Sequence, residues 1–394
     1  MKRTITLIFI AFFSFSTLFG QTTKTMTWDG QERKYIEYVP ASYQQGTPAP
    51  VLFCLHGLGD DMTNAFNTFG FKKIADDHGW ILITPQALEA YVEMISASIG
   101  AAWNSGISAD ASIIGGSGRI YINKDVDDSG FMMAILDNLI ENYSIDEDNV
   151  FVTGFSMGGF MTNRLAIEHS DRIKAGASVS GTIGCDLLQD GKSQVPHISM
   201  MHIHGTADEM VTYNNGSLMY YMFELPISKG GAEATVEFWR NTNGCDPTPE
   251  VYQFEDIAND NLTFEKYTYK NGTNGTKTCF IKANNGKHTW YYTPANDIDY
   301  ATEIYNFFAS CMNETSVNNE LTQQFEIVPN PSTGIFHINA DNLKQANIYD
   351  MLGNKITERI DNTIDLTNYP SGIYLIEIIS NNGARQCRKI VVEK

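Results

Sequence analysis

An apolar, β-branched run stops at a glycine and leads into a serine flanked by small residues in Asn149-Val150-Phe151-Val152-Thr153-Gly154-Phe155-Ser156-Met157-Gly158-Gly159. A helix-like pattern begins directly afterwards, at Phe160. This is a Gly-x-Ser-x-Gly pattern between a strand and a helix, where a tight turn excludes side chains two residues before and after the serine. The serine hydroxyl then projects beside a helix N-terminus, which favours developing negative charge. We predict Ser156 as a catalytic nucleophile; the alternative is a turn of small residues packed for steric reasons.

Working outward from this turn, the strand and helix patterns alternate. An uninterrupted apolar run, typical of a strand buried on both faces of a parallel sheet, occurs at 51–55, and mostly apolar runs at 80–85, 149–155 and 195–203 predict further buried strands. A β-hairpin is expected over Lys24–Tyr38, around Asp29-Gly30. Helical patterns cover 64–77, 125–142, 160–169, 232–241 and 298–312. The pattern predicts an α/β fold, a mostly parallel sheet flanked by helices, of the α/β-hydrolase type.

Two further loops carry the partners that a serine nucleophile needs. Asp208 follows the strand that ends near Ile203, and His288 lies in a glycine loop beyond the last strand of the sheet. The chain order Ser156, Asp208, His288 is the order of an α/β-hydrolase triad, with the histidine as base and the aspartate as the orienting acid. His202 and His204 precede the acid and fit the order less well.

The backbone N–H groups of Leu58 and Met157 are the candidate oxyanion donors. Leu58 lies in the His-Gly loop after the strand at 51–55, and Met157 follows the serine. The stretch 86–124 reads as a long irregular loop and holds Trp103, either a wall of a substrate cleft or a residue that packs the loop down. Trp290, two residues after His288, is a second candidate substrate contact. The carboxylates at 125–128 suit a helix N-terminus better than catalysis.

Composition limits the partners of this chain. Its 394 residues are 43% hydrophobic and 12% aromatic, enough for one large packed domain and a smaller one. The formal net charge of −19 disfavours nucleic acid and anionic membrane surfaces, because like charges repel. Two cations and a short apolar stretch over 2–13 indicate a secretory signal over 1–20, cleaved after Gly20 or after Ser16. No later run is long enough to span a bilayer.

Export permits disulfides among the six cysteines. Cys54 lies inside an apolar run and is expected to be a buried thiol. Cys245 and Cys279 flank a strand-rich stretch and are the favoured pair, with Cys185 and Cys311 as a second possibility. No Cys-x-x-Cys or His-x-x-x-His spacing predicts a metal site, and no cofactor is expected.

The composition and the residue pattern of the sequence change towards the C-terminus. Residues 313–323 are polar and read as a linker after a catalytic domain over 21–312. From Phe325 onward, short alternating runs separated by Pro, Gly and Asn predict a small β-sandwich over 324–394. This region carries no catalytic constellation.

Two resemblances follow from these motifs. Six segments follow one another along the chain: Leu55-His56-Gly57, Trp103-Asn104, 125–131, 154–159, His204-Gly205-Thr206-Ala207-Asp208 and Lys287-His288-Thr289-Trp290. In this order they resemble the secreted polyhydroxybutyrate-depolymerase-like and feruloyl/acetylxylan esterase family, and the resemblance covers roughly residues 24–312. The resemblance implies Ser156, Asp208 and His288 as the triad and favours a Cys245–Cys279 bridge.

The C-terminal segments Pro329-Asn330-Pro331-Ser332-Thr333-Gly334, 348–353 and 369–374 resemble the sorting domain of the type IX secretion system of Bacteroidetes. That resemblance implies export across both membranes by the type IX machinery, then release or surface attachment. The alternative is a generic accessory β-sandwich, for example a carbohydrate-binding one.

These observations predict a secreted serine esterase that acts on acetyl or feruloyl esters of plant polysaccharide. Within enzymes the alternative is an extracellular polyester depolymerase. From a different class, the alternative is a surface binding protein with an inactive hydrolase domain.

Overall fold

The computed structural model describes residues 20–93, 96–188, 197–220, 222–312, 326–339, 343–350, 355–359, 362–380 and 385–394. The chain divides into two compact units, residues 1–312 and residues 313–394. The expected signal segment before Gly20 and the expected linker at 313–323 lie outside the described residues.

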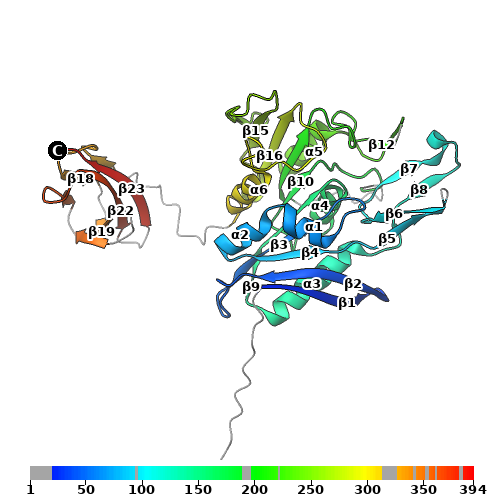
Figure 1. The fold of residues 1–394 in the computed structure, drawn as a ribbon, viewed down its shortest axis with the longest axis horizontal. Helices are drawn as coiled ribbons and strands as arrows, with labels where there is room; N and C mark the ends of the chain where they lie inside the picture. The colour runs from blue at the N-terminus through cyan, green and yellow to red at the C-terminus, as the bar shows by residue number, and fades with distance from the viewer. Residues whose placement is uncertain are drawn as a thin grey trace, which may run out of the picture. The chain divides into compact units, whose positions relative to one another are not determined.

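A ten-stranded sheet runs through the first unit (Figure 1). From one edge to the other its strands are β1 (Gly20–Trp28), β2 (Gln31–Val39), β4 (Ile81–Pro85), β3 (Ala49–Leu55), β9 (Ile145–Phe155), β10 (Ala175–Val179), β11 (Ser199–Gly205), β16 (Thr278–Asn284), β15 (Thr263–Tyr269) and β14 (Glu250–Gln253). The strands from β4 to β16 are parallel, and the two pairs at each edge are antiparallel. The predicted mostly parallel sheet is therefore confirmed, and the loops after its parallel strands meet at one edge.

Helices cover both faces of this sheet. On one face α3 (Asp128–Asn142), α4 (Met157–Glu168) and α5 (Ala232–Asn243) bury Phe131, Phe160 and Trp239. On the other, α1 (Met62–Thr68), α2 (Phe71–His78) and α6 (Tyr300–Ala309) bury Phe66, Phe71 and Phe308. The single helix predicted over 64–77 is wrong: Gly70, at φ 84°, separates two short helices, and a side chain there would press on Ala301 Cβ at 3.0 Å. Among the described helices, none is both long and apolar enough to span a membrane.

Three hairpins project beyond the carboxyl edge of the parallel strands (Figure 1). The stretch 86–124 is not irregular as predicted: it forms the hairpins β5 (Glu89–Val92) with β6 (Ala97–Ala101) and β7 (Ser108–Asp110) with β8 (Arg119–Tyr121), with a 3-10 turn, η2 (Ala111–Ile114), between β7 and β8. We call these the first arm. The hairpin of β12 (Leu218–Tyr220) with β13 (Phe223–Leu225), which follows β11, is the second arm. Strands of three to five residues carry too little periodicity to be recognised in the sequence.

The second unit consists of two antiparallel sheets around one core. One contains β17 (Glu326–Val328), β18 (Ile335–Asn339) and β21 (Thr363–Asp365). The other contains β20 (Lys355–Arg359), β19 (Leu343–Tyr349), β22 (Gly372–Ser380) and β23 (Arg385–Val392). Phe336, Ile348, Ile364 and Ile376 from both sheets share the core, as the predicted alternation requires.

Candidate active site

Ser156 occupies a strained turn between β9 and α4. Its φ of 55° and ψ of −119° lie outside the regions that side chains prefer, which costs on the order of 1–3 kcal/mol. A side chain at Gly154 would clash with the backbone of Gly158, and one at Gly158 would clash with the carbonyl group of Leu55. The backbone N–H of Ser156 donates to the Val179 carbonyl at 2.8 Å and holds the turn. The glycines are therefore required by close packing, as the sequence pattern predicts.

The structure brings Ser156, His288 and Asp208 together from the loops after β9, β16 and β11. His288 Nε2 lies 2.9 Å from Ser156 Oγ, and His288 Nδ1 lies 2.8 Å from Asp208 Oδ2. In the tautomer that satisfies both contacts, Nδ1–H donates to the carboxylate and Nε2 accepts from the serine hydroxyl. This arrangement can remove the serine proton during nucleophilic attack.

Asp208 is held from several directions. Its Oδ1 accepts the backbone N–H groups of Met210 at 2.9 Å and Val211 at 2.8 Å. Its Oδ2 lies 2.8 Å from His288 Nδ1 and 3.3 Å from His204 Nε2. Burial acts to raise the pKa of Asp208, but the hydrogen bonds from His204 and His288 outweigh it and hold that pKa well below its usual range. The carboxylate is therefore ionised and fixed in orientation.

A buried pair of histidines lies behind the acid, and the sequence analysis did not assign it a role. His204 Nε2 is 2.9 Å from the Val211 carbonyl, so this nitrogen carries the proton and also faces Asp208. His204 Nδ1 then accepts from His202 Nε2 at 3.2 Å. His202 Nδ1 has no hydrogen-bond partner, and complete burial lowers the pKa of His202 well below its usual value. Both side chains lie on one face of β11 because alternate strand residues share a face, which is the signal the sequence carried.

The oxyanion candidates stand next to the serine. The β-position of Gly57 is 3.5 Å from Ser156 Cβ, so the loop passes beside the serine directly before it reaches Leu58. Met157 is the first residue of α4, and its N–H belongs to the first turn, where helices lack internal acceptors.

The two predicted tryptophans play different structural parts. Trp103 is fully buried, so the expectation that it walls a substrate cleft is wrong. Its ring contacts His56, with 4.8 Å between ring centroids, and its Nε1 donates to the His56 carbonyl at 2.8 Å, which fixes the loop that leads to Leu58. Trp290 is half-buried and stacks on Phe69 at 4.5 Å, and so anchors the loop that carries His288.

The acids predicted for the first turn of α3 divide into two roles. Asp127 is its N-cap and accepts the backbone N–H of Gly130 at 2.9 Å. Asp128 is fully buried and pairs with Arg33 Nη2 at 2.6 Å, a contact between residues 95 positions apart that local patterns cannot indicate. Asp128 also accepts the backbone N–H of Asn104 at 2.7 Å and so supports the segment of Trp103.

The predicted disulfides are wrong. Cys245, Cys279 and Cys311 all have unbridged thiols. The Cys245 Sγ atom faces Thr278, 3.9 Å from its hydroxyl, while Cys279 points to the opposite face of β16, into the core beneath α6. Successive residues of a strand point to opposite faces of the sheet. Thr278 therefore faces Cys245, and its neighbour Cys279, the predicted partner, faces away from it. Cys54 is buried, as predicted, and burial raises the pKa of the Cys279 thiol to about 12.

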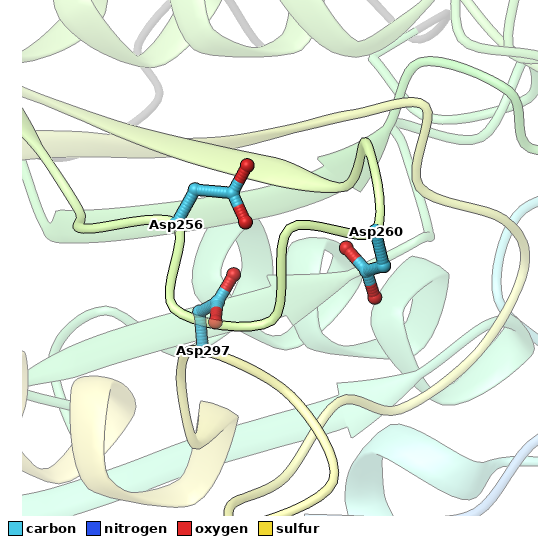
Figure 2. A group of neighbouring side chains, drawn as sticks. All are labelled: Asp256, Asp260 and Asp297. Carbon is cyan, nitrogen blue, oxygen red and sulfur yellow. The ribbon is translucent and has the colours of Figure 1, made fainter.

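Three carboxylates other than Asp208 gather in one place, and the sequence analysis had not grouped them. Asp256 and Asp260 come from the connection between β14 and β15, and Asp297 from the segment before α6 (Figure 2). One oxygen of each lies within 4.8 Å of the others. Each also accepts backbone N–H groups: Asp256 from Asn259, Asp260 from Leu262, and Asp297 from Ile257 and Ala258. These hydrogen bonds account for the turns of the loop.

Two family models match the chain. Residues 41–229 match the phospholipase/carboxylesterase family, and residues 326–393 match the secretion system C-terminal sorting domain. The second match indicates a protein secreted or surface-attached by the type IX route, as expected. With the sheet described above, the first match confirms the α/β-hydrolase fold class.

Curated relatives include feruloyl and acetylxylan esterases. Feruloyl esterase B of Piromyces equi is 24% identical over 65% of this chain and 42% of its own length. The bifunctional acetylxylan esterase/xylanase XynS20E of Neocallimastix patriciarum is 24% identical over 47% of this chain and 22% of its own. Feruloyl esterase C of Emericella nidulans is 25% identical over 55% and 64%. The chain thus spans less than two thirds of the length of each.

Among solved structures, an acetyl xylan esterase from Aspergillus awamori superimposes on this chain with a TM-score of 0.46 and 16% sequence identity. The match covers 73% of this chain and 99% of that protein.

Proposed function

Since the chain carries a phospholipase/carboxylesterase domain of the α/β-hydrolase fold related to feruloyl and acetylxylan esterases, we propose that it is a secreted serine esterase that cleaves acetyl or feruloyl esters of plant polysaccharide. The observation that carries the proposal is the contact chain from Ser156 Oγ to His288 Nε2, 2.9 Å, and from His288 Nδ1 to Asp208, 2.8 Å. In this proposal residues 1–20 are the signal, 21–312 the catalytic domain and 324–394 the sorting domain that engages the type IX machinery.

The mechanism follows from the roles of these side chains. His288 Nε2 accepts the Ser156 proton as Oγ attacks the ester carbonyl carbon, and ionised Asp208 stabilises the imidazolium that forms. The backbone N–H groups of Leu58 and Met157 bind the tetrahedral oxyanion; loss of one such donor typically costs about 2.7–4 kcal/mol of barrier stabilisation. His288 then protonates the departing alcohol, and water resolves the acyl-enzyme with the same base. No step requires a metal ion or an organic cofactor.

The proposal is tested by the release of acid from acetylated xylan, methyl ferulate and polyhydroxybutyrate, with Ser156→Ala measured beside the wild type. We expect turnover of acetylated xylan or methyl ferulate and its loss in the variant. Turnover of the polyester alone would identify a depolymerase instead. A chain that hydrolyses none of the three and whose Ser156 resists a fluorophosphonate would be a binding protein with an inactive hydrolase domain.

A further inference from the structure

A cavity of about 90 Å³ lies between the two arms. The first arm supplies Ile99 and Ile120, the second supplies Leu218 and Leu225, and most of its other lining residues are also aliphatic. Two lining side chains carry a hydroxyl group, Ser108 and Tyr220. The Ser108 hydroxyl accepts from Arg119 Nε at 3.0 Å and so has a partner already. An apolar cavity of this kind favours an apolar occupant over water.

The first arm is fastened to the loop that leads to Leu58. The backbone N–H of Gly59 donates to the Ala101 carbonyl at 2.8 Å, at the end of β6. The Ile99 carbonyl oxygen lies 3.7 Å from the β-position of Gly59. One wall of the cavity therefore continues directly into the loop that holds Leu58.

The second arm is fastened to the loop of the acid. The backbone N–H of Met219 donates to the Met210 carbonyl at 2.9 Å, and Val211 forms a β-bridge with Leu218. Met210 and Val211 are the residues whose N–H groups bind Asp208. The opposite wall of the cavity is thus attached to the acid of the triad.

The remaining wall reaches the nucleophile through the loop after β10. The β-position of Gly181 abuts the carbonyl oxygen of Ser156, and that of Gly184 abuts Gly106, which precedes the lining residue Ile107. The backbone N–H of Cys185 donates to the carbonyl of the lining residue Ile227 at 2.9 Å. The loops of the candidate oxyanion donor, the acid and the nucleophile are therefore each in contact with a segment that lines this cavity.

We propose that the cavity binds an apolar group of the ester that is larger than a methyl group, on either the acid or the alcohol side. The inference rests on the proposed function, since it assigns a part of the same substrate. One water molecule, which is similar in size to a methyl group, occupies about 30 Å³, so the cavity holds roughly three groups of that size. The methyl of an acetyl ester would leave most of it empty, whereas a four-carbon chain or the edge of an aromatic ring would fill it.

The test compares kcat/KM for p-nitrophenyl acetate and p-nitrophenyl butyrate, and separately for ethyl and butyl acetate. Each buried methylene is expected to raise kcat/KM about fourfold, so two raise it about 15-fold in the series whose variable group enters the cavity. A rise in the first series assigns the cavity to the acid side, and a rise in the second assigns it to the alcohol side. No rise in either overturns the proposal.

Variants tie the preference to these residues. Leu218→Trp fills the cavity from the second arm and should bring the 15-fold ratio close to 1; Ile120→Trp repeats the test from the first arm. The ratio of two substrates does not depend on how much of the variant is folded. Val251→Trp, at an exposed position of β14, should keep the wild-type ratio. An unchanged ratio in both cavity variants overturns the cavity alone, whereas absence of turnover of every ester by the wild type overturns the proposed function and this inference with it.

Discussion

Replacing Asp128 by Asn tests how strongly the buried ion pair with Arg33 supports the domain. Both side chains are at most 1% exposed, and their nearest atoms are 2.6 Å apart. Arg33 also lies over the Phe131 ring, with 4.1 Å from its guanidinium carbon to the ring centroid, so it cannot swing out to water without breaking the core. Asp128→Asn keeps the shape of the side chain and leaves a guanidinium charge buried without its counter-charge.

The expected cost is set by that uncompensated charge. Removing one partner of a buried pair typically destabilises a protein by about 3–5 kcal/mol. For a domain of roughly 290 residues, an unfolding entropy of about 2.1 cal/mol/K per residue corresponds to about 1.6 °C of melting temperature per kcal/mol, which gives a fall of about 5–8 °C. Burial raises the pKa of Asp128, and the Arg33 guanidinium and the Asn104 amide oppose that rise. The cost of burying the carboxylate is therefore offset by its interactions with these two groups.

Urea and thermal unfolding of the full chain measure this cost. Lys34→Met serves as the control, because the Lys34–Glu32 pair is exposed and should contribute at most about 1 kcal/mol. The double variant Arg33→Met/Asp128→Leu should unfold less easily than Asp128→Asn, since it removes both charges together. If Asp128→Asn is no less stable than Lys34→Met, the account of the buried pair is refuted.

Three further predictions follow from the site and its surroundings. His204→Phe removes a buried hydrogen bond to the ionised Asp208, so the free energy of unfolding should fall by about 1.5–3 kcal/mol; an unchanged urea midpoint would refute the role given to this contact. His202, whose pKa is lowered by burial, binds a proton more readily in the unfolded chain, so the free energy of unfolding should fall as the pH drops below about 6.5, by up to about 1.4 kcal/mol per pH unit for this group. In urea titrations at pH 7.5, 6 and 5, the free energy of unfolding of His202→Phe should depend less steeply on pH than that of the wild type. An identical pH dependence would refute the claim that buried His202 destabilises the protein at low pH. Reductant should leave the melting temperature unchanged, because Cys245 and Cys279 are thiols; a clear drop would show that a bridge exists.

Local rules made the nucleophile turn predictable. The requirement for Gly154 and Gly158 arises within five residues, and the structure places both against backbone atoms. The approach of Asp208 and His288 to Ser156 could also be expected, because loops after parallel strands meet at one sheet edge.

The features that could not be predicted from the sequence depend on contacts between distant segments or on the direction of one side chain. Arg33 and Asp128 come from an edge strand and a helix, and neither position alone signals a pair. His204 was set aside as the catalytic base because it precedes Asp208 in the chain, and its place behind the Asp208 carboxylate becomes visible only in the folded sheet. Cys279 and Thr278 differ by one strand position, which is enough to send the thiol to the wrong face.

The most direct test of the account is the site of covalent labelling by a fluorophosphonate, read by mass spectrometry of the digested protein. An activated serine attacks phosphorus and releases fluoride, whereas an ordinary serine does not. We predict an adduct on the peptide that contains Ser156, absent in Ser156→Ala and strongly reduced in His288→Ala. A wild-type protein that stays unlabelled at Ser156, or labels equally without His288, would contradict the claim that these residues form a catalytic triad.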